Sequence, residues 1–276
     1  MSTRLTPKQT SAFRRKVLER YRRHPRAFPW RDYAAPGVPY RVFVSEVMLQ
    51  QTQVGRVAAK LPAFLEAFPD FRALARAPLA RVLAEWKGLG YNRRAKFLRG
   101  AAIRIESGFG GILPRDPTLL ATLPGIGPNT AASICAYAYN LPIPFVETNI
   151  RTVYIHFFFA RRRKVADAEI LALVEQTIDR RDPRRWFNAL MDCGAMLKEE
   201  HGNLSRRSAT HRLQSRFEGS DRQIRGRVLA LLLEGPRRAS TIARVLDLPR
   251  ERVDPVLARL AGEGLLCRTA RGYAID

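Results

Sequence analysis

Apolar positions recur with a helical period along most of the chain, and few segments show the strict alternation of a strand. The spacing of Val47, Val54 and Leu61 predicts a long amphipathic helix over about residues 40–68, with a break near Pro62. Shorter helices are expected around residues 74, 79–83, 170–174 and 186–197, and a glycine-rich loop over 108–114. The pattern therefore predicts an all-α fold.

The C-terminal part has a different pattern. Residues 201–220 are polar and basic, which indicates a linker after a main domain over 1–200. Three helical clusters follow, with Ser240 as the expected N-cap of the second, and then two short strands. This is the order of a winged helix, so residues 221–276 are expected to form a small winged-helix-like module. Its third helix is a candidate for the DNA major groove, but it mixes Arg with Glu and Asp, so DNA contact and protein contact both remain open.

Charge narrows the class of partner. The 276 residues include 48 Lys and Arg against 25 Asp and Glu, a net charge of +23, which favours a polyanion such as nucleic acid. No apolar run is long enough to span a membrane, and the first residues lack the apolar core of a secretory signal. The cysteines, Cys135, Cys193 and Cys267, lie too far apart for a disulfide framework or a CxxC metal site. We therefore expect a cytoplasmic protein with no metal ligands of this kind.

The segment 120–139 has the pattern of a helix-hairpin-helix. A short helix is expected to end at Leu123, and a second to begin at Pro128, a residue that the first helical turn tolerates. Between them, Gly125 and Gly127 permit unusual backbone angles and a close approach. The amide groups that open the second helix, at Asn129 and Thr130, can then meet a DNA phosphate; these two residues and both glycines are predicted to bind DNA.

Several motifs in order carry a resemblance. They are FPWR (28–31), PYRVFVSEVMLQQTQV (39–54), GLGYNRRA (88–95), LPGIGPNTA (123–131) and ALMDCGAML (189–197). Over about residues 10–198 the chain resembles the helix-hairpin-helix DNA glycosylases, the superfamily of endonuclease III and the MutY-type adenine glycosylases, and the MutY type more closely. The resemblance implies two helical subdomains, 31–140 and 1–30 with 141–200, around a DNA-binding cleft with the hairpin at its mouth.

Cleavage of an N-glycosidic bond requires a proton for the leaving base and a negative charge near the cationic sugar, which two carboxyl groups can supply. The resemblance assigns the general acid to Glu46, whose neighbours are apolar, and the second carboxylate to Glu147, followed by Asn149 near the sugar. The superfamily normally has aspartate where this chain has Glu147. Three interpretations follow: a cleft adjusted to glutamate, a different target base, or DNA binding without cleavage.

The remaining assignments also rest on the resemblance. Asn129 stands where bifunctional relatives have a Schiff-base lysine, so we expect no lyase activity. The target base must leave the DNA double helix before it can be cleaved. The resemblance implies that Gln50, Gln51 and Tyr91 fill the space that this base vacates and contact its former partner base. It also places Arg31 among the DNA contacts.

The chain departs from the superfamily after Lys198, where an iron–sulfur cluster normally begins. Four cysteines are required and only Cys267 follows, so no cluster is expected. The basic segment 201–216, with Arg206 and Arg207, is expected either to bind phosphate in its place or to be a solvated linker. A monovalent cation at the hairpin remains open.

The sequence thus predicts a monomeric, nucleoid-associated, monofunctional DNA glycosylase of base excision repair, acting on duplex DNA with a mispaired or damaged base, most simply adenine in a purine mismatch. A thymine or uracil mismatch glycosylase and a non-catalytic DNA-binding protein are the alternatives.

Overall fold

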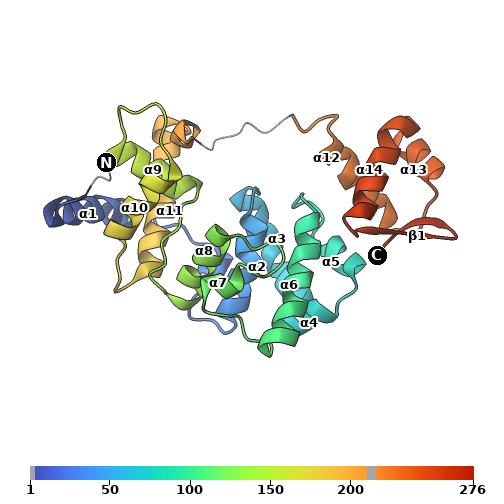
Figure 1. Cartoon of the computed structure of the whole chain (residues 1–276), viewed down its shortest axis with the longest axis horizontal. Coiled ribbons are helices and arrows are strands. Elements are labelled where there is room, and N and C mark those ends of the chain that lie inside the picture. Colours follow the sequence, from blue (N-terminus) through green and yellow to red (C-terminus); the bar gives the residue numbers. More distant parts are fainter. Residues whose placement is uncertain (1–3, 210–215) are drawn as a thin grey trace. The chain divides into compact units, whose positions relative to one another are not determined.

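The computed structural model describes residues 4–209 and 216–276, which form helices and one small hairpin of strands (Figure 1). The chain divides into two compact units. The first comprises Met1–Phe43, Arg115–Thr122 and Ile126–Leu213, and the second Val44–Pro114, Leu123–Gly125 and Gln214–Asp276. The expected domains are drawn differently: here residues 31–43 belong to the first unit, and residues 214–276 belong to the second unit together with residues 44–114.

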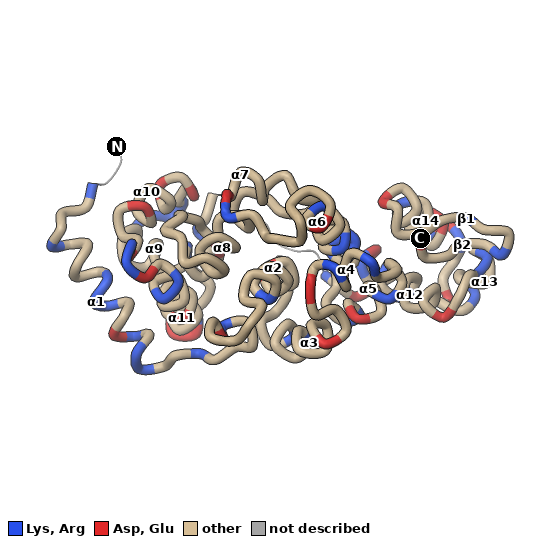
Figure 2. Tube along the Cα trace, turned by 90° about the horizontal axis from the view of Figure 1, so that it is seen from below, with Lys and Arg blue, Asp and Glu red and all other residues tan. Residues whose placement is uncertain are grey.

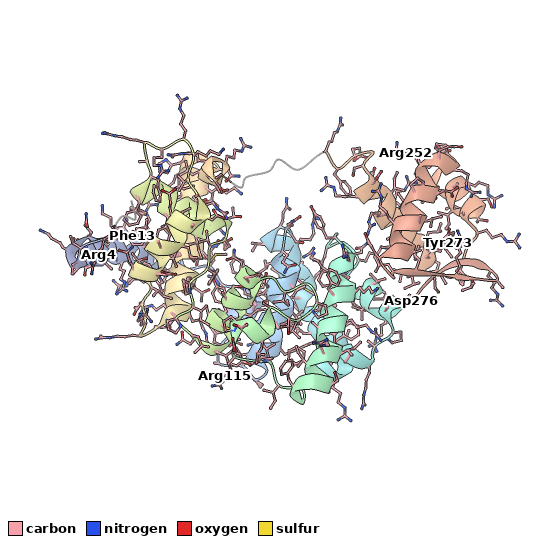
Figure 3. All side chains as sticks on the ribbon, in the orientation of Figure 1. Arg4, Phe13, Arg115, Arg252, Tyr273 and Asp276 are labelled. Atoms are coloured by element: carbon pink, nitrogen blue, oxygen red, sulfur yellow. The ribbon has the colours of Figure 1, made fainter. Side chains whose placement is uncertain are left out.

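The first unit is helical throughout. Its helices are α1 (Pro7–Arg23), the beginning of α2 (Val38–Leu49), α7 (Pro117–Leu120), α8 (Pro128–Tyr139), α9 (Thr148–Phe158), α10 (Asp167–Thr177) and α11 (Pro183–His201), with 3-10 turns at Pro29–Arg31 and Leu204–Arg207. Phe13 of α1, labelled in Figure 3, has its ring centre 5.3 Å from that of Tyr154 on α9 and 5.8 Å from that of Trp186 on α11. These buried rings join three helices into one core.

The second unit begins with the end of α2. Its further elements are α3 (Val54–Ala67), α4 (Phe71–Arg76), α5 (Leu79–Glu85), α6 (Arg93–Phe109), α12 (Asp221–Leu232), α13 (Ala239–Leu246), α14 (Arg250–Gly262), β1 (Leu266–Thr269) and β2 (Gly272–Ile275). Phe64 packs edge-on against Phe68 and Trp86, and all three rings are buried.

In the C-terminal part, α12, α13 and α14 precede an antiparallel hairpin in which Leu266 pairs with Ile275, so three helices and two strands follow one another as the sequence predicted. The backbone of Arg237 exchanges two hydrogen bonds with that of Tyr273 and adds a third strand position. Figure 2 shows Lys and Arg along α1, and both signs of charge on α14.

The expected long helix over 40–68 is wrong in one respect: the break lies at residues 50–53, between α2 and α3, and not near Pro62. Gln51, with φ of 54°, has the left-handed backbone that ends α2. Pro62 lies inside α3, where its exposed side faces solvent and its buried neighbours Leu61 and Phe64 keep the helix packed.

Other boundaries shift by a few residues. The helix before the hairpin ends at Leu120 and not at Leu123, and α13 begins at Ala239, so Ser240 lies within its first turn. The expected loop begins later, because α6 continues to Phe109 and ends at Gly110 with φ of 59°. Among the described residues, no helix combines the length and apolar character needed to cross a membrane.

Candidate active site

The residues predicted from the sequence fall on both units. The first unit holds Arg31, Gly127, Asn129, Thr130, Glu147, Asn149, Arg206 and Arg207, and the second holds Glu46, Gln50, Gln51, Tyr91 and Gly125.

Glu147 is the N-cap of α9. Its Oε1 accepts hydrogen bonds from the backbone N–H groups of Asn149, at 2.6 Å, and Ile150, at 3.0 Å. The longer glutamate side chain therefore folds back over its own helix, as its extra methylene requires. Burial raises the pKa of Glu147, while the bonds from Ile150 and Asn149 and the charge of Arg151 act in the opposite direction.

Arg151, one turn along α9, does not neutralise this carboxylate through an ion pair of its own. Its guanidinium is bound by both oxygens of Asp167, with Nε to Oδ1 at 2.8 Å and an NH2 group to Oδ2 at 2.7 Å. Glu147 consequently takes its hydrogen bonds from helix amides, which stabilise a carboxylate without cancelling its charge.

Asn129 contacts the residue before Glu147. Its side-chain Nδ2 donates to the carbonyl of Val146, and its Oδ1 accepts from the Val146 N–H at 3.3 Å. The sequence predicted a DNA contact here. The structure shows a two-point intramolecular contact that fixes the approach to α9.

Gly194 was not among the residues predicted from the sequence. It lies on α11, the helix that packs most extensively against α9. A Cβ atom at this position would lie 2.3 Å from the carbonyl oxygen of Asn149 and 2.7 Å from its Cβ. Only glycine permits this approach. The signal in the sequence was a glycine inside a helix, which costs about 1 kcal/mol relative to alanine and indicates a packing reason.

Two of the predicted DNA contacts are occupied inside the protein. Arg31 is 11% exposed and binds both oxygens of Asp192, each at 2.9 Å; Asp192 itself is fully buried and also accepts from Arg26. Arg207 donates to the carbonyls of Phe159 and Arg162. These contacts support structural roles for Arg31 and Arg207.

Arg206 is exposed, and His211 and Arg212 of the same basic segment lie outside the described residues.

The hairpin has the predicted local form. Gly127 is the N-cap of α8 and Pro128 its first residue, so the amides of Asn129 and Thr130 open the helix. Gly125 has φ of 76°, and a Cβ there would lie 2.8 Å from the Cβ of Phe97. Gly127 has φ of −86°, so the expected unusual backbone angle holds only for Gly125.

In the second unit, Gln51 and Tyr91 both have left-handed backbones, with φ of 54° and 48°. Such strain in non-glycine residues persists where surrounding contacts hold it, and it is common at functional sites. Gln50 lies beside the hairpin, since its Nε2 donates to the carbonyl of Gly125 at 3.3 Å.

Arg94 holds the two strained turns together. Its guanidinium donates to the carbonyls of Val47 and Met48, both at 2.8 Å, and to Thr52 Oγ1 at 2.7 Å. It also donates to the carbonyls of the 89–90 turn that precedes Tyr91. Burial lowers the pKa of Arg94 to about 10, so the side chain remains charged at neutral pH. Sequence reasoning missed this residue because its partners Val47, Met48 and Thr52 lie 42 to 47 positions away.

Glu46 lies on α2 and is partly buried. Its sequence neighbours Val44, Val47 and Met48 are buried. No cluster of three or more metal-binding side chains occurs among the residues described.

The cysteines do not fit an iron–sulfur cluster. Cys135 lies in α8, Cys193 in α11 and Cys267 in β1. Burial raises the pKa of the Cys135 thiol to about 11 and that of the Cys193 thiol to about 12, so both thiols are protonated at neutral pH in this structure.

Comparison with known proteins identifies the family. Residues 44–176 match the family model of the HhH-GPD superfamily base excision DNA repair proteins. The adenine DNA glycosylase of Mycolicibacterium smegmatis is 34% identical, over 93% of both chains, and that of Mycobacterium tuberculosis is 33% identical, over 93% of this chain and 90% of its own. This coverage extends past residue 198, so the resemblance does not end there as expected.

The fold also matches a solved structure. A thermostable thymine-DNA glycosylase aligns with 68% of this chain and 87% of its own, with a TM-score of 0.61 and 24% identity. The extent and identity of the sequence matches, together with this fold, establish the family. The chain belongs to the HhH-GPD superfamily of base excision DNA repair proteins.

Proposed function

We propose that this protein is a DNA glycosylase that hydrolyses the N-glycosidic bond of a mispaired adenine in duplex DNA. The observation that carries the proposal is Glu147: its carboxylate caps α9 through backbone amides while the nearby Arg151 is paired with Asp167. A charge held in this way suits the stabilisation of a cationic sugar. The two mycobacterial relatives named adenine DNA glycosylase support the choice of base.

The reaction divides between two carboxyl groups. Glu46, protonated, donates its proton to the flipped adenine as the bond from C1′ to the base nitrogen breaks, and the bonding electrons leave with the base. Glu147, ionised, stabilises the positive charge that develops on the sugar. Water then adds to C1′ and loses a proton, which yields free adenine and an abasic site. Asn149, at the start of α9, lies beside the sugar.

The hairpin supplies a grip on the DNA backbone. The amides that open α8, at Asn129 and Thr130, can receive a phosphate oxygen, and Gly127 leaves room for its approach. The exposed Arg206 adds a phosphate contact. Gln50, Gln51 and Tyr91 occupy the space from which the base is withdrawn.

Three further properties belong to this proposal. The enzyme has no Schiff-base lyase step, because Asn129 cannot form an imine. It works without an iron–sulfur cluster, because three cysteines on separate elements cannot supply four thiolates. It acts as a monomer on the nucleoid of the cytoplasm. Iron analysis and the mass in solution by light scattering test the last two.

The decisive experiment compares wild type with Glu46→Gln on duplexes that carry every mismatch and common lesion, adenine opposite 8-oxoguanine included. Glu46→Gln keeps the shape of the side chain and removes the proton donor, so excision should fall by at least about a hundredfold. DNA binding should remain. Undiminished cleavage by Glu46→Gln contradicts the assignment of Glu46 as general acid. If the wild-type protein preferentially releases thymine or uracil, that base and not adenine is the target.

Substitution of Glu147 distinguishes a cleft adjusted to glutamate from a site whose activity has decayed with the loss of aspartate. Glu147→Gln removes the charge and should slow excision by at least about a hundredfold. Glu147→Asp should also be slower than wild type, because the cleft is fitted to a glutamate folded over α9. A faster aspartate variant indicates a decayed site, and equal rates for all three residues contradict the two-carboxylate mechanism.

A further inference from the structure

Arg151 of α9 does not pair with the carboxylate that lies one turn away on its own helix. Glu147 precedes it by four residues, and side chains four residues apart lie on one face of a helix, with the acidic residue first as the favourable order. Arg151 instead donates to both oxygens of Asp167, the first residue of α10, at 2.8 and 2.7 Å. The Arg151 side chain is 14% exposed, so this contact fixes its direction.

The pair with Asp167 prevails over the local alternative because of its geometry. Two parallel N–H···O bonds join the flat guanidinium to the flat carboxylate, and the opposite charges strengthen each bond. Glu147 offers less to a guanidinium, because its Oε1 already accepts from the amides of Asn149 and Ile150. The arrangement therefore depends on a carboxylate at position 167.

Asp167 is itself held by a third segment of the chain. The hydroxyl of Ser208 donates to Oδ1 of Asp167 at 3.3 Å. The backbone beside it is joined as well, because the N–H of Val165 donates to the carbonyl of Arg207 at 3.0 Å, and the N–H of Ala209 donates to the carbonyl of Val165 at 2.9 Å. The basic segment that begins after α11 thus fixes the start of α10 and the carboxylate that binds Arg151.

The charge of Arg151 acts on Glu147 even from this position. It lowers the pKa of Glu147, against the larger raising effect of burial. A direct ion pair would bring the guanidinium beside the carboxylate and offset the negative charge that the proposed reaction uses. On the neighbouring helix α11, the charge of Asp192 is already compensated by Arg26 and Arg31.

We propose that Asp167 is a positioning residue, which holds the guanidinium of Arg151 away from Glu147 so that the Glu147 carboxylate keeps its charge for the cationic sugar. The inference rests on the proposed function for the role of Glu147 in catalysis. Asp167 contacts neither the DNA nor the reacting atoms in this proposal and acts through Arg151. Ser208 supports the same arrangement through its bond to Asp167.

The test uses two variants that break the same ion pair from opposite sides. Asp167→Asn releases Arg151 to pair with Glu147, so the titration of Glu147 should move to lower pH, because an adjacent cation favours the ionised form. Arg151→Gln removes the cation, so the titration should move to higher pH. Both are measured by ¹³C NMR of the glutamate side-chain carboxyl groups in the full-length protein without DNA, with the signal assigned by Glu147→Gln.

Single-turnover excision provides a second measurement. Asp167→Asn should slow excision by about tenfold or more, because Arg151 offsets the charge of Glu147. The double variant Asp167→Asn with Arg151→Gln should regain the rate of Arg151→Gln alone, because the competing cation is gone. Glu169→Gln is the matched control, since Glu169 also lies in the first turn of α10 and pairs with a different arginine, Arg162; it should change neither measurement.

A role in packing alone would give different results. Titrations of Glu147 that move in the same direction in both variants, or a double variant as slow as Asp167→Asn, would overturn the proposal. If Asp167→Asn does not fold, Arg151→Gln decides by itself, because an unchanged or lower midpoint contradicts the effect of Arg151 on Glu147. The NMR titration requires no substrate, so a failure of the proposed function in the excision panel leaves this test of Asp167 intact.

Discussion

Gly194 offers the sharpest test of how the site is held. Gly194→Ala adds a single methyl group inside α11, where the carbonyl oxygen of Asn149 lies 2.3 Å from the position of the new Cβ. Ordinary van der Waals contact begins at about 3.4 Å. The start of α9 must therefore move away from α11 by about 1 Å, and Glu147 moves with it because its carboxylate is bound to the amides of Asn149 and Ile150.

The size of the effect follows from this displacement. A shift of about 1 Å in a catalytic group costs on the order of a hundredfold in rate. Overpacking of a buried contact between helices costs about 1–3 kcal/mol of unfolding free energy. Gly194→Ala should therefore lower the single-turnover rate of excision by about a hundredfold. The affinity for DNA should change little, since the hairpin amides lie on α8.

The assay combines three measurements on folded protein: single-turnover excision on whichever duplex of the panel is cut, DNA affinity by fluorescence anisotropy, and thermal unfolding by circular dichroism. Gly108→Ala is the matched control, because Gly108 is also helical and a Cβ there meets nothing within 4 Å. It should keep the full rate and gain about 0.5–1 kcal/mol of stability. If Gly194→Ala has the same excision rate and stability as Gly108→Ala, the contact between Gly194 and Asn149 does not hold Glu147 in position.

Four further outcomes are expected. The rate of excision should fall as the pH decreases through the raised pKa of Glu147, because protonation removes the charge that faces the sugar. A profile of excision rate against pH should show this decrease with a midpoint above the pKa of an ordinary glutamate, and Glu147→Gln should lack the decrease. Arg94→Lys should lower the unfolding free energy by about 2–4 kcal/mol in denaturant titration, because an ammonium cannot reach all the partners of the guanidinium fork; an unchanged midpoint speaks against this role. Borohydride should trap no covalent adduct between the protein and DNA; a trapped adduct identifies another amine that reacts with the sugar. Asn129→Ala should slow excision several-fold at unchanged affinity for DNA, because the backbone of Val146 loses both of its hydrogen bonds with the Asn129 side chain.

The sequence by itself determined the features that depend on neighbouring residues. Pro128 opens α8 after Gly127, and the three helices and hairpin of the C-terminal module appear in the expected order. Both follow from local backbone preferences and from the period of apolar residues, which act over one or two helical turns. The assignment of Glu46 and Glu147 to catalysis came from the resemblance of ordered motifs and remains a prediction.

The contacts between distant segments could be learned only from the packed chain. The break between α2 and α3 depends on Arg94, whose hydrogen bonds to Met48 and Thr52 span 46 and 42 residues. The contact of Gly194 with Asn149 joins two helices in the same way, and Arg31 is withdrawn from solvent by Asp192, 161 residues away. Periodicity carries no information about partners at such separations, because a hydrogen bond or a close approach between helices exists only after the chain has packed.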